Sequence, residues 1–195
     1  MSVLILGLIL FLGIHSVRIV ADDWRGRMLT RVGEGPWKGL YALTSAAGFG
    51  LIVWGFSLAR QQPIPVWIPP LGLRHAASLL TLVAFILVAA AYVPGNAIRA
   101  RLHHPMVLGV KAWALAHLLA NGQLAHLVLF GAFLAWAVFD FRSLRQRDRS
   151  AGITYAGGHA LGTLLTLALG TVAWAAFAFW LHGWWIGVRP LAGGA

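Results

Sequence analysis

The chain has 195 residues, of which 59% are hydrophobic and only 10% charged, with a net charge of +10 and no cysteine. Soluble domains average about 45–50% apolar and about 25% charged residues, so this composition is typical of a membrane protein. The absence of cysteine excludes disulfides, thiolate catalysis, iron–sulfur clusters and covalently attached haem. The basic residues lie between apolar runs, which favours contact with anionic lipid headgroups and argues against nucleic acid as a partner.

The first apolar run, residues 2–20, has the position of a signal peptide but not its pattern. No basic segment precedes it, no small-residue cleavage site follows it, and Arg18, Arg25 and Arg27 lie at its end or just after it. We therefore expect an uncleaved first span with the N-terminus outside.

The apolar runs predict an all-α, polytopic membrane helical bundle with about six transmembrane segments, forming one domain over residues 1–195. A helix needs about 20 residues to cross the hydrocarbon core. Asn121-Gly122 divides the region 105–139 into two helices joined by a tight turn. The predicted spans are 2–20, 37–59, 75–95, 105–120, 123–139 and 160–188, with connections at 21–36, 60–74, 96–104 and 140–159.

The basic residues support this arrangement, because cytoplasmic connections carry an excess of Lys and Arg. The three outer basic residues would be Arg60, Arg74 and Arg189. The twelve inner ones would be Arg18, Arg25, Arg27, Arg31, Lys38, Arg99, Arg101, Lys111, Arg142, Arg145, Arg147 and Arg149. Residues 105–120 rise only about 24 Å, so this segment either crosses a thinned site or is re-entrant.

Ionisable groups within apolar spans are costly and often functional. His15 lies late in the first span, and Arg18 and Asp22 follow on the same helix face, at ion-pair spacing from one another. His15 is either a metal ligand or an ordinary hydrogen-bonded residue near the inner interface.

The run HHPMVLGVKAWALAHLLANG, residues 103–122, places three histidines and a lysine in an apolar segment. Pro105 suits the first turn of a helix, so His104 is expected to cap it or to hold a headgroup or a propionate. Lys111 can extend to the inner surface. His117 lies about two turns further on, where it either bonds to a neighbouring helix or, with a second histidine, ligates a haem iron.

The remaining histidines offer alternatives. His75 and His182 are expected on the outer side, where they could form a second or alternative ligand pair, whereas His126 and His159 more simply pack or face headgroups. The five acidic residues form no spaced carboxylate pair of the type that acid–base hydrolysis needs.

Four segments together, LGIHSVRI, RHAASLLTLVAFILVAAAYVPG, HPMVLGVKAWALAHLLANG and LHGWWIGVRPL, resemble the NnrU family of bacterial inner-membrane proteins, which is linked to nitrite and nitric oxide reduction. The family is related to 15-cis-zeta-carotene isomerase, a haem b enzyme. By that resemblance His15 and His117 match the isomerase's proposed iron ligands, and Arg18, His104 and Lys111 are candidates for the haem propionates. The isomerase has a cysteine where this chain has Ala114, so a cysteine-based ligand switch is not expected here.

Three functions follow as hypotheses. The first is a haem b protein of the inner membrane with a redox or nitric oxide role linked to denitrification, or with polyene isomerase activity. The second is an accessory or assembly factor for a respiratory reductase. The third follows from HPMVLG, which is similar to a signature of membrane methyltransferases that bind S-adenosylmethionine, although no acidic residue follows Asp148 in this chain.

Overall fold

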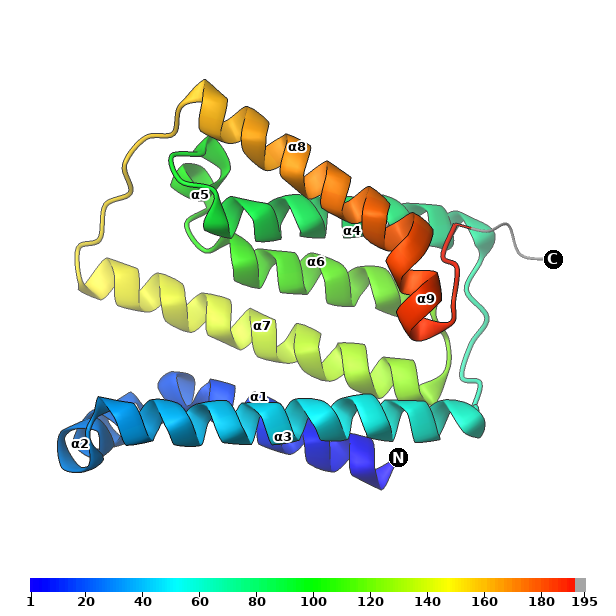
Figure 1. Ribbon diagram of the computed structural model, residues 1–195, viewed down its shortest axis with the longest axis horizontal. Helices are drawn as coiled ribbons and strands as arrows, with labels where there is room; N and C mark the ends of the chain where they lie inside the picture. Colours follow the sequence, from blue (N-terminus) through cyan, green and yellow to red (C-terminus); the bar gives the residue numbers. More distant parts are fainter. Residues whose placement is uncertain (192–195) are drawn as a thin grey trace. The chain divides into compact units, whose positions relative to one another are not determined.

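The computed structural model describes residues 1–191, which form helices joined by short connections (Figure 1). Five stretches are long and apolar enough to cross a membrane, and Pro105–Ala120 is a shorter apolar helix, which confirms the all-α membrane architecture for the described residues. The helices are α1 (Ser2–Val20), α2 (Asp22–Val32), α3 (Glu34–Gln61), α4 (Leu71–Tyr92), α5 (Ala97–Leu102), α6 (Pro105–Ala120), α7 (Leu124–Ser150), α8 (Ala160–Ala176), a π-helical turn η1 (Phe177–Leu181) and α9 (His182–Ile186).

The chain divides into two compact units. Unit 1 comprises Met1–Ile68 and Asn121–Ser143, and unit 2 comprises Pro69–Ala120 and the residues from Leu144 onward. Helices α1, α2 and α3 therefore belong to unit 1 with most of α7, whereas α4, α5, α6, α8 and α9 belong to unit 2.

In unit 1, α1 and α3 pack with their backbones in close contact (Figure 1). A Cβ atom placed on Gly55 would lie 2.3 Å from the backbone nitrogen of Leu4, and one on Gly48 would lie 2.7 Å from that of Phe11. The low-numbered end of α1 thus meets the high-numbered end of α3, so the two helices are antiparallel. Small residues at such positions allow membrane helices to pack closely, where the hydrophobic effect gives little driving force.

Helix α7 meets α1 and α3 through side chains rather than through close backbone contact. No Cα atom of α7 lies within 8 Å of a Cα atom of α1 or α3. Aromatic rings fill part of this space: Phe133 lies 5.8 Å from Phe11, ring centre to ring centre, and Phe56 lies 5.0 Å from His126. Packed helices usually have axes 8–10 Å apart, so α7 stands further off than a typical neighbour.

In unit 2, α4 is the central helix, with α6 and α8 packed against it. A Cβ atom on Gly109 of α6 would lie 3.0 Å from the carbonyl oxygen of Ala84, and one on Gly170 of α8 would lie 2.6 Å from the Cα atom of Ile86. The indole of Trp174 donates a hydrogen bond of 3.1 Å to the Thr81 hydroxyl, which ties α8 to α4.

The turn after α6 is hydrogen-bonded to the connection between α3 and α4. Within unit 1, the Val66 N–H donates to the Gly122 carbonyl at 2.8 Å, and the Leu124 N–H donates to the Ile64 carbonyl at 2.9 Å. The turn at Asn121–Gln123 therefore lies beside the connection between α3 and α4.

Three of the predicted connections, 21–36, 96–104 and 140–159, are partly helical. Their helical segments are polar, so hydropathy does not reveal them. Residues 22–32 form α2 with no buried residue, and residues 97–102 form α5, which Asn96 caps by accepting a 2.7 Å hydrogen bond from the Arg99 N–H. Helix α7 continues to Ser150, about ten residues beyond its predicted end. The span predicted at 160–188 is helical to Ile186 but contains the turn η1.

Candidate functional site

His15 lies in an aromatic surrounding in unit 1. Its ring centre is 4.3 Å from that of Phe11, 5.2 Å from that of Tyr41 and 6.1 Å from that of Trp136. These rings come from α1, α3 and α7, so all three long helices of the unit contribute. We call His15 and these three rings the His15 cluster.

Unsatisfied polar atoms accompany this cluster. The indole nitrogen of Trp136 is buried and has no hydrogen-bond partner, and the same is true of the Ser45 hydroxyl. Ser45 lies one turn after Tyr41 on α3, on the face that carries Gly48 toward α1. Buried polar groups almost always have a partner, so these two atoms are exceptions to the usual pattern.

His117 lies on α6 in unit 2, half-buried, with its ring centre 5.2 Å from that of Trp113. Ala114 is fully buried on the same helix. His15 and His117 belong to different units.

The two histidines share one local geometry. The Nδ1 atom of His15 lies 2.6 Å from the Phe11 carbonyl oxygen, and that of His117 lies 2.8 Å from the Trp113 carbonyl oxygen, in each case four residues earlier. A carbonyl oxygen can only accept, so each Nδ1 carries the proton and each neutral ring has its lone pair on Nε2. This is the arrangement by which proteins orient histidines that bind metals through Nε2.

Two basic residues lie close to these histidines along their own helices. Arg18 is one turn after His15, and its Nε atom lies 3.7 Å from a carboxylate oxygen of Asp22, as the sequence spacing predicted. Its side chain is 56% exposed, so this ion pair does not bury it. Lys111, half-buried, lies six residues before His117, a rise of about 9 Å.

His104 makes a side-chain contact that the sequence did not predict. Its carbonyl accepts the Leu108 N–H at 3.3 Å in the first turn of α6, but its Nε2 atom lies 2.8 Å from a carboxylate oxygen of Asp148. The same oxygen accepts a 2.7 Å hydrogen bond from the Tyr155 hydroxyl. Asp148 was missed by sequence reasoning, since it lies 44 positions after its partner.

His103 completes this group, which we call the His104 cluster (His103, His104, Arg145, Asp148 and Tyr155). The His103 ring stacks on that of Tyr155 at 4.1 Å and 15°, and its Nδ1 accepts a hydrogen bond from the Arg145 guanidinium. Its φ of 71° lies in the left-handed region that few residues other than glycine adopt. Burial and the neighbouring Asp148 carboxylate raise the pKa of Tyr155, so its phenol stays protonated and donates.

The other histidines have local roles or none that the structure shows. His75 is exposed on α4, and His182 Nδ1 lies 2.6 Å from the Val188 carbonyl, so no contact joins the alternative pair in the described chain. His159 caps α8 by accepting a 3.0 Å hydrogen bond from the Gly162 N–H. His126 has a buried Nδ1 without a partner beside Phe56, in the first turn of α7.

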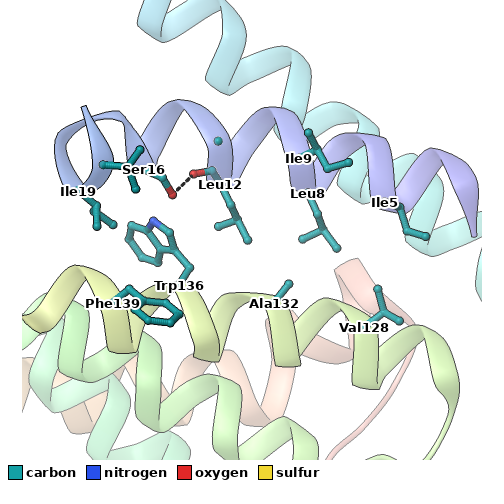
Figure 2. A pocket seen from close by; sticks show the side chains of 12 residues that line it. Ile5, Leu8, Ile9, Leu12, Ser16, Ile19, Val128, Ala132, Trp136 and Phe139 are labelled. Carbon is teal, nitrogen blue, oxygen red and sulfur yellow. Dashed lines mark hydrogen bonds between the residues drawn. The ribbon is translucent and has the colours of Figure 1, made fainter. Parts of the chain in front are cut away.

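An open apolar cleft of about 680 Å³ lies between α1 and α7, beside the His15 cluster (Figure 2). Trp136 belongs to both, because it contacts His15 and also lines the cleft. Figure 2 shows its indole extending from α7 toward Ser16 on α1, whose hydroxyl donates to the Leu12 carbonyl at 2.6 Å.

Comparison with other proteins identifies the family. Searches of curated proteins and of solved structures gave no match. The sequence model of the NnrU protein family matches residues 3–190, which is nearly the whole chain. The chain therefore belongs to the NnrU protein family, in agreement with the resemblance of its motifs.

Proposed function

We propose that this protein is a haem b protein of the bacterial inner membrane, with the N-terminus outside, and that His15 and His117 are the axial ligands of the iron. The observation that carries the proposal is the hydrogen bond from each Nδ1 to the carbonyl four residues earlier. It holds each ring in the tautomer that presents Nε2 to a metal.

The residues around His15 fit a haem. A porphyrin needs apolar and aromatic neighbours for its faces. Phe11, Tyr41 and Trp136 provide them, with ring centres 4.3, 5.2 and 6.1 Å from that of His15. The unpartnered Trp136 indole and Ser45 hydroxyl supply hydrogen-bonding capacity in an otherwise apolar setting.

Arg18 and Lys111 are the propionate partners we propose, because charge-assisted hydrogen bonds to carboxylates are strong and each lies within two turns of its histidine. His104 fits this role less well. It lies thirteen residues before His117, about 20 Å along the helix, and its ring nitrogen is already engaged by Asp148.

A haem held by two imidazoles would supply reversible one-electron chemistry within the membrane. The chain's own residues bind the group, set the histidine tautomers and keep water away with aromatic rings. We therefore favour a redox role linked to nitric oxide metabolism. Polyene isomerisation is the alternative to this role that the resemblance of the motifs suggests.

Absorption spectra of the purified, haem-reconstituted protein test the proposal. We expect a low-spin haem b spectrum with a Soret band that shifts on reduction. His15→Ala and His117→Ala should each give a high-spin spectrum or lose the haem, whereas His75→Ala and His182→Ala should keep the wild-type spectrum.

Three results would contradict this assignment. A reconstituted wild type without a Soret band removes the haem. Spectra changed by His75→Ala and His182→Ala but not by His15→Ala assign the iron to the alternative pair. Unchanged spectra in all four variants place the ligands elsewhere. If the protein proves haem-free, co-purification of a reductase subunit supports an accessory role instead.

A further inference from the structure

The cleft between α1 and α7 is large and apolar. Its volume of about 680 Å³ lies within the range of pockets that hold small molecules. Its walls are aliphatic and aromatic apart from the Ser16 hydroxyl and the Trp136 indole, so water would find few partners in it. The lining side chains are Ile5, Leu8, Ile9, Leu12, Ser16, Ile19 and Val20 from α1, with Val128, Ala132, Trp136 and Phe139 from α7.

The cleft is open to its surroundings, because some of its lining side chains are exposed. Ile9 is 63% exposed and Phe139 is 59% exposed, and no Cα atom of α1 lies within 8 Å of one in α7. In a membrane, this opening faces apolar molecules that can enter sideways from the bilayer.

The cleft runs along both helices. It extends from Val128 to Phe139 on α7 and from Ile5 to Val20 on α1, which correspond to about 16 and 22 Å of helical rise. One leaflet of a bilayer contributes about 15 Å of hydrocarbon, half of the roughly 30 Å core. A single chain that enters from one leaflet therefore fits the length of the cleft.

The two ends differ in polarity. The end with Ile5 and Val128 is wholly aliphatic, whereas Ser16 and Trp136 lie in the other half (Figure 2). Beyond that half α1 ends and the charged helix α2 begins. Arg18 at the end of α1 and Arg25, Arg27 and Arg31 in α2 outnumber the acidic residues Asp22 and Asp23, which leaves an excess of positive charge.

From these features we infer that the cleft binds one acyl chain of a phospholipid, with the phosphate headgroup at the end near Trp136 and α2. The phosphate is anionic and complements the basic excess of α2, and the chain lies against the aliphatic residues toward Ile5. Since Trp136 also contacts His15, a lipid held here would form one wall of the His15 cluster.

Gly13 provides a sharp test, because it lines the cleft and a Cβ atom placed on it would meet nothing within 4 Å. Gly13→Leu should fill the cleft without straining the helix. Gly50→Leu on α3 is the matched control, since Gly50 also has open space around it and does not line the cleft. In native mass spectrometry of detergent-purified full-length protein, we expect one retained phospholipid in the wild type and in Gly50→Leu, and loss of that lipid in Gly13→Leu.

A second measurement uses phosphatidylglycerol with brominated acyl chains, which quench tryptophan fluorescence on contact. Titration into the detergent-purified protein should give a saturable component that Trp136→Phe removes and that Trp54→Phe, a change on exposed α3 surface, retains. If Gly13→Leu folds poorly, as judged by circular dichroism, Ala132→Leu fills the same cleft from α7.

Several results would overturn the inference. Equal lipid retention in Gly13→Leu and Gly50→Leu shows that the lipid binds elsewhere. A wild-type dimer that Gly13→Leu dissociates assigns the cleft to a second copy of the chain. Loss of the haem spectrum in Gly13→Leu assigns the cleft to the porphyrin. The lipid measurements need no haem, so failure of the haem proposal leaves them interpretable.

Discussion

At the scale of single residues, Asp148 shows how a charge is accommodated near the end of a membrane helix. One of its carboxylate oxygens accepts hydrogen bonds from both His104 and Tyr155, and its side chain is 18% exposed. These bonds join the start of α6, the end of α7 and the loop after α7, all within unit 2. The cluster therefore fixes the loop as well as compensating the carboxylate.

Tyr155→Phe should change how the stability of the protein depends on alkaline pH. The pKa of Tyr155 is raised by burial and then by Asp148, so the folded state favours the neutral phenol over the phenolate. An unfolded tyrosine has a pKa of about 10, so this contribution is present below about pH 10 and is lost as the pH rises through the folded value. Thermal melts between pH 8 and 11 should fall more steeply for the wild type than for Tyr155→Phe.

The phenylalanine keeps the ring that stacks on His103, so the variant tests the hydroxyl alone. At pH 8 it should be less stable by about 1 kcal/mol, the usual value of a hydrogen bond lost. Parallel pH profiles for the two proteins would show that Tyr155 does not titrate with unfolding. Phe85→Leu, outside the cluster, should leave the alkaline slope unchanged.

At the scale of elements, the contact between α1 and α3 includes three glycines with no room for a side chain, Gly7, Gly48 and Gly55. Gly55→Ala places a methyl group 2.3 Å from the Leu4 backbone nitrogen, so the helices must separate. We expect destabilisation of about 1–3 kcal/mol, the usual cost of overpacking. Gly50→Ala on the same helix meets nothing and should stabilise by about 0.5–1 kcal/mol, because alanine is the better helix former.

Thermal unfolding in one detergent, followed by circular dichroism, measures both variants. Opposite shifts in melting temperature are the expected result. A Gly55→Ala protein as stable as Gly50→Ala would show that α1 and α3 do not pack as closely as the structure has them.

The long helices were predictable because each contains an apolar run long enough to cross a membrane. Asn121-Gly122 marked the turn between α6 and α7, and the structure has that turn. Helix α2, with DDWRGRMLTRV, was missed since its stability does not come from an apolar run, and α5 was missed because its six residues are held by a cap on Asn96.

The candidate site was predictable only in part. The sequence indicates His15 and His117, because an imidazole within an apolar helix is costly. Their hydrogen bonds to carbonyls depend on side-chain rotamers, and the rings of Tyr41 and Trp136 come from distant helices. The pairing of His104 with Asp148 likewise joins positions far apart in sequence, which periodicity does not predict.

At the scale of the whole molecule, the number of crossings decides which loops share a side of the membrane. Hydrogen bonds between residues 64–67 and 122–124 place the turn after α6 beside the connection between α3 and α4. If α6 crosses, the arginine-rich end of α7 returns to the side that holds α2 and α5. Counting α6 as re-entrant instead would send that end to the opposite side, against the positive-inside rule.

Single-cysteine labelling tests this topology, since the natural chain has no cysteine and each introduced thiol is the sole target. Gln62→Cys, in the connection after α3, should react with a membrane-impermeant maleimide in intact cells, because we expect the N-terminus and this connection outside. Gly26→Cys in α2 and Ala151→Cys after α7 should react only once the membrane is permeabilised. Labelling of Ala151→Cys in intact cells, with Gly26→Cys still protected, would mean that α6 does not cross and that the chain has five spans. Labelling of both Gly26→Cys and Ala151→Cys in intact cells, with Gln62→Cys protected, would mean that the protein has six spans in the inverted orientation. The basic residues would then lie outside, against the positive-inside rule.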